Sequence, residues 1–273
     1  MKIAVPTMDR VDSQVFVNTL PVSMRELVHF YAPEEDCAGL RQLHPQCKFH
    51  PTPRFGIAKT RQFMLEDSQG PVLMVDDDVS LTTTVWDDEK GCVRQGTVMN
   101  ENTPEEWELF LDSLSQGIMQ GCGMVGVTYA SQAWQMARRD FEAGLLGPTR
   151  TWSIYAVNPK LAKTFRIRFD KLPCMEDFDF NLQMLRSGVS TGSLTKFCWT
   201  QRQSNADGGC SGYRTFEVQK ESAEGLKARH PNFVRVVKKK AGWGNGLEER
   251  YDTVVQWAKA GKAGKAPVIE GIS

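Results

Sequence analysis

The sequence predicts an α/β protein with a mostly parallel sheet and helices on both faces of the sheet. Strand-like apolar segments alternate with helix-like segments from residue 2 to residue 200, as in chains built from βα units. Polar residues follow directly after two of these strands, at 7–10 and at 76–78. In a parallel sheet both groups would lie at the carboxyl edge, where such folds bind ligands.

The N-terminal elements follow from apolar runs and breaker residues. Residues 2–7 form the first expected strand, and residues 20–30 a short helix that runs into a second strand at 27–31. Prolines and a glycine then predict loops over 33–53, with at most a short helix. These breakers are Pro33, Gly39, Pro45, Pro51 and Pro53.

Clearer helix signals follow. Residues 56–67 carry apolar side chains near helical spacing, and Gly70-Pro71 ends the helix. Residues 72–75 are four apolar residues in a row and predict a buried strand. Residues 103–106 (Thr-Pro-Glu-Glu) predict a helix start, with a threonine N-cap, a proline at the first helical position and a glutamate three residues after the cap.

The remaining elements of the expected sheet lie in the second half of the chain. Strands are expected at 121–129, 150–157 and 194–200, and the first of these is rich in glycine. Helices are expected after Asn158 and over 176–187. The alternation of strands and helices therefore continues to residue 200.

Composition divides the chain into three regions. Residues 1–215 form the expected catalytic domain, with a donor half at about 1–100 and an acceptor half at about 101–215. Residues 216–260 form a basic extension that is expected to pack on this domain. The small, polar tail 261–273 is expected to be flexible.

Bulk properties disfavour several classes of protein. The formal net charge is zero, so any contact with nucleic acid requires a local basic patch. No apolar run approaches the roughly 18 residues of a membrane span, and the N-terminus resembles a strand more than a signal peptide. The seven cysteines include no Cys-x-x-Cys pair, which disfavours a zinc site or disulfide framework and fits a reducing cytoplasm.

Three consecutive acids, Asp76, Asp77 and Asp78, follow the strand at 72–75. Side by side and unpaired they would repel one another, and a cation would offset that repulsion. Hard oxygen ligands suit Mg²⁺ or Mn²⁺, so Asp76 and Asp78 are candidate metal ligands, with Asp77 pointing away, toward a ribose hydroxyl. The alternatives are an acidic turn after the strand and a helix N-cap cluster.

A second acidic group, Glu176, Asp177 and Asp179, opens the helix at 176–187. Helix capping and the helix dipole could account for these acids, but a carboxylate held there could also accept a proton from an attacking hydroxyl. Asp177 is the first choice for this base and Asp179 the second. Across the cleft, Lys59 and Arg61 could reach a nucleotide or the acidic cluster, unless they only form a solvated helix face.

Together these motifs resemble the GT-A glycosyltransferases, a Rossmann-like class that uses nucleotide-sugar donors. The matching segments are residues 3–10, 56–61, 75–78 with the Asp-x-Asp motif, and 175–177 with a Glu-Asp motif. The resemblance implies Mn²⁺ or Mg²⁺ at Asp76 and Asp78, Thr7 and Arg10 at the nucleotide, and Asp177 as the base of an inverting enzyme. In this class a late histidine often completes the metal shell, and His230 is the candidate here.

The compact size and the segment 53–62 are more narrowly similar to the glycosyltransferases associated with the TET and JBP dioxygenases. Those occur in phages and kinetoplastids and modify hydroxymethylated pyrimidines in DNA. The resemblance implies a UDP-sugar donor and 5-hydroxymethylcytosine, or a similar base, in DNA as the acceptor. For a phage-encoded chain, it also implies the host cytoplasm as location.

Support for a DNA acceptor in the residues is partial. The segment 227–240 is locally basic, although its lysines could be a solvated charge run. A base in a duplex must be flipped out to reach Asp177. The candidate acceptor and DNA contacts are Trp152, Trp199, Arg202, Tyr213, Lys238, Lys239 and Lys240. Tryptophans such as Trp152 are also common core residues.

The sequence therefore predicts a metal-dependent glycosyltransferase that moves a sugar from a UDP-sugar to a hydroxymethyl group in DNA. The first alternative is a glycan, lipid-linked or protein acceptor. The second is a nucleotidyltransferase or a non-catalytic DNA-binding module. A nucleotidyltransferase usually has a Gly-rich loop after its first strand, and residues 7–12 contain no glycine. Neither the donor sugar nor the oligomeric state follows from the sequence.

Overall fold

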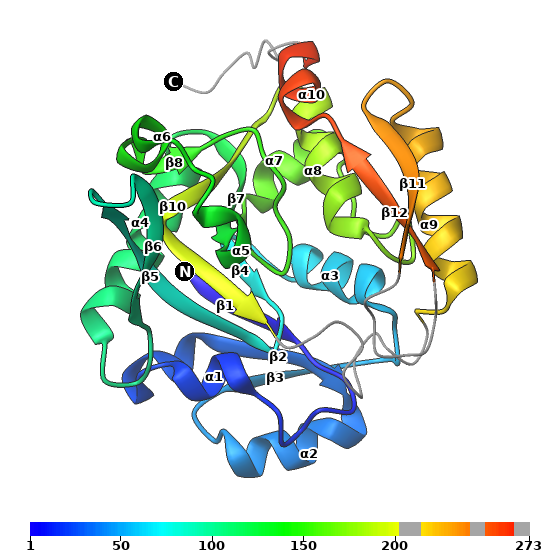
Figure 1. Ribbon diagram of the computed structural model, residues 1–273. Coiled ribbons are helices and arrows are strands. Elements are labelled where there is room, and N and C mark those ends of the chain that lie inside the picture. Colours follow the sequence, from blue (N-terminus) through cyan, green and yellow to red (C-terminus); the bar gives the residue numbers. More distant parts are fainter. Residues whose placement is uncertain (202–213, 241–248, 265–273) are drawn as a thin grey trace.

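The structure is a computed structural model that describes residues 1–201, 214–240 and 249–264 (Figure 1). Its centre is a 10-stranded sheet. In spatial order the strands are β3 (Lys48–Thr52), β2 (Val28–Pro33), β1 (Lys2–Pro6), β4 (Val72–Val75), β9 (Ile154–Val157), β7 (Cys122–Tyr129), β10 (Ser190–Gln201), β5 (Val79–Asp87) and β6 (Cys92–Val98), with β8 (Leu145–Leu146) paired to β10. Only β9, β5 and β8 run opposite to the rest, so the predicted α/β class and mostly parallel sheet are confirmed.

Helices cover both faces of the sheet, as the sequence predicts. One face carries α1 (Val15–Thr19), the 3₁₀ helix η1 (Val22–Leu27), α2 (Glu34–Leu43) and α4 (Pro104–Met119); the other carries α3 (Ile57–Glu66), α7 (Pro159–Thr164) and α8 (Glu176–Arg186). Two short helices, α5 (Ala130–Ala133) and α6 (Arg138–Ala143), connect β7 to β8. Side chains of a strand alternate between faces, so Ile3 and Val5 join the first core cluster and Ala4 joins the second.

The structure corrects the prediction of loops over 33–53. The ten-residue helix α2 begins directly after Pro33, and β3 follows it. Pro51 is tolerated within β3 because this strand is the edge of the sheet and pairs only with β2. The breakers that predicted loops therefore mark a helix start and an edge strand.

Residues 76–78 connect β4 to a second strand and not to a helix. β5 starts at Val79 and forms an antiparallel hairpin with β6. The helix N-cap alternative for these acids is therefore wrong. The hairpin extends the sheet beyond β10. The acidic turn is therefore held between two strands, β4 before it and β5 after it.

The C-terminal elements form a separate layer next to α8 (Figure 1). They are α9 (Phe216–Arg229), β11 (Val234–Lys240), β12 (Glu249–Val255) and α10 (Trp257–Ala263), and β11 and β12 form a two-stranded antiparallel sheet of their own. Leu226, Val234 and Ala260 are buried against Phe178 and Leu182 of α8. Residues 265–273 of the expected tail lie outside the described residues.

Within the described ranges, no helix has the length and apolar character that crossing a lipid bilayer requires.

Candidate active site

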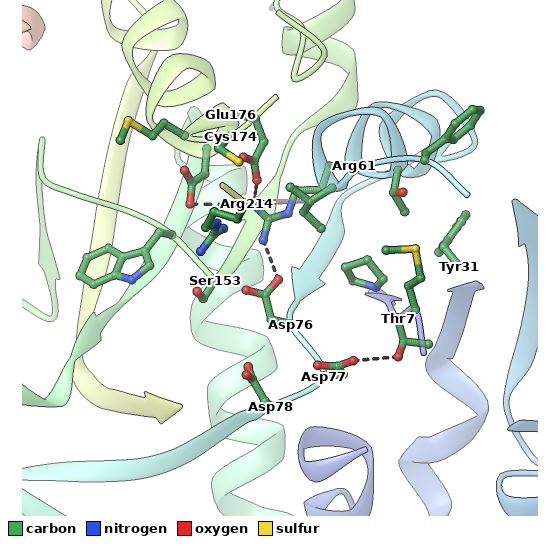
Figure 2. A pocket seen from close by; sticks show the side chains of 18 of the residues that line it. Thr7, Tyr31, Arg61, Asp76, Asp77, Asp78, Ser153, Cys174, Glu176 and Arg214 are labelled. Atoms are coloured by element: carbon green, nitrogen blue, oxygen red, sulfur yellow. Dashed lines mark hydrogen bonds and ion pairs between the residues drawn. The ribbon is translucent and has the colours of Figure 1, made fainter. Parts of the chain in front are cut away.

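One cavity of about 290 Å³ lies beyond the carboxyl ends of β1 and β4 (Figure 2). The loop after β1 lines it with Thr7 and Arg10, and the turn after β4 with residues 76–78. The first turn of α8 adds Glu176 and Asp177. The structure therefore brings together the two acidic motifs and the β1 loop that the sequence assigns to one site.

The three aspartates of the turn have different surroundings. Asp77 is buried and accepts hydrogen bonds from the hydroxyl of Thr7 at 2.7 Å and from Arg10 at 2.9 Å. Asp78 has a weaker contact with Arg10, at 3.4 Å. Burial, and then the charges of Asp76 and Asp77, raise the pKa of Asp78 to about 7, although Arg10 opposes the shift. Asp77 therefore holds the turn, and Asp78 carries a charge that is incompletely offset.

Arg61 joins the two acidic motifs (Figure 2). Its guanidinium is almost fully buried and donates to Asp76 Oδ1 at 2.6 Å and to Glu176 Oε1. Its Nη1 also lies 3.8 Å from Asp177 Oδ2. Of the two roles that the sequence left open for this residue, the structure shows contact with the acidic cluster.

Asp177 is a largely buried carboxylate at the cavity wall. Its side chain lines the cavity and is 13% exposed. Burial, and then the neighbouring charge of Glu176, raise the pKa of Asp177 to about 7, against the opposing charges of Arg61 and Arg150. A base with a pKa close to neutral can take a proton from a substrate and still be ionised in a large part of the molecules.

Strained backbone surrounds the cavity. The non-glycine residues with positive φ in the described ranges include Asp9 (57°), Ser153 (59°) and Met175 (60°), and each lies within or beside a segment that lines the cavity. Ser153 accepts the backbone N–H of Asp76 at 2.9 Å, and Met175 precedes the first turn of α8. Such conformations collect at functional sites, where they set the direction of neighbouring side chains.

Asp76 and Asp78 offer oxygen ligands that suit a divalent cation. The described residues contain no group of three histidine, cysteine or acidic side chains gathered as a metal site. A bound cation would therefore take its remaining ligands from donor phosphates and water, as Mg²⁺ often does. The charge of Asp78, only partly offset by Arg10, fits such an ion, and Asp76 would share its charge with Arg61.

Asp179 and His230 do not belong to this site. Asp179 is fully buried, accepts from Arg229 and contacts His230 Nε2, both at 2.7 Å. Neither residue lines the cavity. The predictions of Asp179 as an alternative base and of His230 as a metal ligand are therefore wrong: the pair ties α8 to α9.

The two tryptophans that the sequence predicts as acceptor contacts lie in different environments. Trp199 is fully buried and donates its indole N–H to the carbonyl of Val127, so it is a core residue and the prediction of acceptor contact is wrong. Trp152 lines the cavity beside it, with ring centroids 5.2 Å apart. Lys59 is exposed and is not among the lining residues, which favours the solvated-face alternative for it.

The basic strand β11 borders the cavity through one contact. Lys239 donates to Asp252 at 2.8 Å, and Asp252 lines the cavity. Lys238 lies 3.7 Å from Glu249, and Lys240 is exposed. Arg202 and Tyr213, the other predicted acceptor contacts, lie outside the described residues.

The sequence reasoning missed three arginines that line the cavity: Arg150, Arg214 and Arg250. Figure 2 labels Arg214 among the side chains that line the cavity. Each stands alone in the sequence, and no motif marks it. The one available signal was the position of Arg150 two residues before Trp152, at the start of the strand predicted over 150–157.

A family model matches most of the chain. The model of the TET-Associated Glycosyltransferase family matches residues 1–209, which confirms the resemblance that the sequence motifs indicate. No curated protein matches the chain.

Several solved structures are similar at low identity. A mannosyltransferase from Pyrobaculum calidifontis, solved with GDP-mannose and Mn²⁺, is 13% identical with a TM-score of 0.43, over 70% of this chain and 53% of that one. GalNAc-T7, solved with UDP, GalNAc and Mn²⁺, is 10% identical with a TM-score of 0.42, over 73% and 43%. A putative glucose-1-phosphate thymidylyltransferase from Bacillus anthracis is 12% identical with a TM-score of 0.37, over 74% and 89%. The chain thus spans about half the length of the first two, and likenesses at this level say nothing of substrate or metal.

Proposed function

The chain belongs to the TET-associated glycosyltransferase family, and on this premise we propose that it transfers a sugar from a nucleotide-sugar donor to a hydroxymethylated pyrimidine in DNA. The proposed donor is a UDP-sugar, the proposed acceptor is 5-hydroxymethylcytosine or a similar base, and the proposed outcome is inversion at the anomeric carbon. The enzyme class follows from the family. The donor, the acceptor and the residue roles are the proposal.

One observation carries the proposal: Arg61 contacts Asp76 and lies 3.8 Å from Asp177. A leaving diphosphate beside Asp76 and Asp78 and an acceptor hydroxyl beside Asp177 would therefore share one cavity. This arrangement is needed for a direct displacement at the sugar, because the attacking and leaving oxygens must lie on opposite sides of the same carbon.

In the proposed reaction, Asp177 accepts the proton of the hydroxymethyl group as its oxygen bonds to the anomeric carbon. The bond from that carbon to the diphosphate oxygen breaks, and its electron pair leaves with the nucleoside diphosphate. Arg61 holds the carboxylate of Asp177 in place but offsets its charge only in part, because the shorter contacts of Arg61 are with Asp76 and Glu176. A bound divalent cation would act as a Lewis acid toward the departing diphosphate.

The ends of the cavity support the direction of transfer. Thr7 and Arg10 fix the turn at residues 76–78 and lie at the donor end. Trp152 and Asp177 both line the cavity, and the indole of Trp152, with Arg150 over its ring, could contact an extruded base.

Mass spectrometry of nucleosides tests the proposal. Hydroxymethylated DNA is incubated with the protein, Mn²⁺ and each of several UDP-sugars, then digested. We expect a sugar-sized mass gain on the modified nucleoside. In Asp177→Asn the rate of this transfer should fall by a factor of about 10² to 10⁴.

The same assay separates the proposal from a glycan acceptor. The rate of transfer to DNA should fall steeply from low to moderate salt, because DNA binding releases counterions and therefore weakens as salt is added. Transfer to free oligosaccharides with none to DNA would refute the proposed acceptor and leave the enzyme class intact.

A further inference from the structure

The acceptor end of the cavity contains an arginine in an unusual setting. The guanidinium carbon of Arg150 lies 4.0 Å from the ring centroid of Trp152 and 4.6 Å from that of Phe178. Two aromatic rings therefore restrict the side chain to a narrow range of positions. Stacking of this kind suits the flat guanidinium and would hold it ready for a ligand.

No acid within the described ranges pairs with Arg150. Its Nε is buried without a hydrogen-bond partner, and its guanidinium makes no ion pair with those residues. Burial lowers the pKa of Arg150, and the more distant charges of Asp177 and Asp252 only partly oppose this. Holding a cation in such a place costs free energy unless an anion arrives to balance it.

Two more arginines share the cavity with Arg150. Arg214 and Arg250 line the same cavity. The nearby carboxylate of Asp252 is already contacted by Lys239 at 2.8 Å and by Arg250 at 3.7 Å. The cavity thus gathers three arginines beside Asp177 and Asp252, whereas the turn at residues 76–78 carries three aspartates.

We propose that Arg150 binds a backbone phosphate next to the modified nucleotide, so that this end of the cavity selects a phosphodiester acceptor. The inference rests on the proposed function and deepens it. A guanidinium presents its donors in a planar fork that matches two phosphate oxygens. Among the described residues, the aspartates of the acidic turn contact Arg10 and Arg61 and not Arg150, so a donor diphosphate at that turn is the poorer partner.

A cycle that removes either partner of this contact tests the inference. Fluorescent oligonucleotides with one hydroxymethylated base carry natural linkages or a single neutral methylphosphonate linkage, on the 5′ or the 3′ side of that base. Fluorescence anisotropy at fixed salt gives their affinity for the full-length protein. We expect one neutral linkage to weaken binding to the unsubstituted protein about tenfold, and Arg150→Gln to weaken binding of the natural strand about as much. The neutral linkage should then cause no further loss in Arg150→Gln.

Two further variants secure the comparison. Arg150→Met keeps an unbranched stem between the rings and serves as a second neutral variant. Arg139→Gln is the matched control, because Arg139 lies on α6 with its side chain 89% exposed and does not line the cavity. It should bind both kinds of strand as the unsubstituted protein does.

The outcomes separate the inference from the proposed function. The inference is overturned if neither neutral linkage weakens binding to the unsubstituted protein. It is also overturned if the linkage that does weaken it weakens Arg150→Gln and Arg150→Met as much. In either case, sugar transfer to the strand leaves the proposed function standing. If the unsubstituted protein neither binds nor modifies any hydroxymethylated strand, the proposed function fails and the inference with it.

Discussion

At the scale of single residues, the main feature of the site is that one arginine is shared among several carboxylates. Arg61 is shared between Asp76, Glu176 and, more distantly, Asp177. Arg61 therefore offsets the negative charge of Asp177 only in part. Burial of this carboxylate raises its pKa to about 7. A carboxylate in this condition is a stronger base than one in water.

The raised pKa of Asp177 predicts a pH dependence of the rate. The residue accepts a proton only when it is ionised, so kcat/KM should fall as the pH decreases through about 7 and level off above it. Steady-state kinetics between about pH 5 and pH 9 measure this profile. A flat profile across this range would remove Asp177 from the proposed role.

The same shift predicts a stability effect. The raised pKa means that folding holds a proton on Asp177 that the unfolded chain releases, so its contribution to stability falls as the pH rises from about 4 to about 7. Asp177→Asn should therefore be more stable than the unsubstituted protein by roughly 1–3 kcal/mol above about pH 7 and no more stable near about pH 4. Urea unfolding at the two pH values measures the difference, and equal differences at both would contradict it.

Metal binding can be measured without activity. If Asp76 and Asp78 hold a divalent cation, Mn²⁺ together with a nucleoside diphosphate should raise the melting temperature, since a ligand that binds only the folded state stabilises it. Asp78→Asn should remove most of this increase. Asp112→Asn, at an exposed position on α4, is the control and should retain it. An unchanged increase in Asp78→Asn would leave the metal without this ligand.

Part of the site could be predicted from the sequence, for a physical reason. Consecutive acids are conspicuous in a sequence because like charges repel one another, and both 76–78, after an apolar strand, and 176–177, at a helix start, contain such acids. Arg61 was also found, on the helix before the acids. Arg150 was missed because its setting arises from Trp152 and Phe178, which are brought to it only by folding.

At the scale of secondary structure elements, different acids of α8 line the cavity and hold the helix in place. Its first turn directs Glu176 and Asp177 to the cavity, while Asp179 points to α9 and contacts Arg229 and His230. Three acids in one turn look equivalent in sequence, but successive residues of a helix are about 100° apart, so they cannot share one direction. The sequence could therefore place the acids on one helix but could not tell the base from the support.

His230→Ala tests this division. Asp179 is fully buried, and loss of one of its partners should lower the free energy of unfolding by about 1–3 kcal/mol. The increase in melting temperature caused by Mn²⁺ with the nucleoside diphosphate should remain. Urea unfolding and thermal melting measure the two quantities. A lost metal response with normal stability would restore His230 as a metal ligand.

Element prediction succeeded where a pattern had one interpretation and failed where it had two. Thr103 and Pro104 marked the start of α4 correctly, but the Thr103 hydroxyl makes no capping hydrogen bond and accepts instead from the backbone N–H of Asn100. Prolines predicted loops over 33–53, yet Pro51 lies in edge strand β3, where its missing N–H costs little. The hairpin of β5 and β6 was missed because the acids before it were read as the end of a strand and not as a turn between two strands.

At the scale of the whole molecule, the C-terminal layer completes the core. Leu226, Val234 and Ala260 cover the apolar side of α8, and this layer also supplies Arg250 and Asp252 to the cavity. The family match ends at residue 209, before this layer begins. The matched segment therefore lacks both the cover of α8 and one wall of the site.

A chain that ends at residue 209 should not fold stably. It would expose Phe178, Leu182 and Leu185 and leave Asp179 without Arg229 and His230. Each large apolar side chain is worth about 1.5–3 kcal/mol when buried, so the total loss approaches the 5–15 kcal/mol that stabilises a typical domain. Circular dichroism should show no cooperative thermal transition, and a sharp transition would contradict this expectation.

The central claim is that Asp177 takes the proton of a hydroxymethyl group on a base in DNA while the donor diphosphate lies at Asp76 and Asp78. A structure of the protein with an unreactive nucleotide-sugar analogue and a hydroxymethylated oligonucleotide tests it most directly. The account predicts a distance of about 2.6–3.2 Å between a carboxylate oxygen of Asp177 and the hydroxymethyl oxygen. A hydroxymethyl group held elsewhere, with its oxygen beyond hydrogen-bond reach of Asp177, would contradict it.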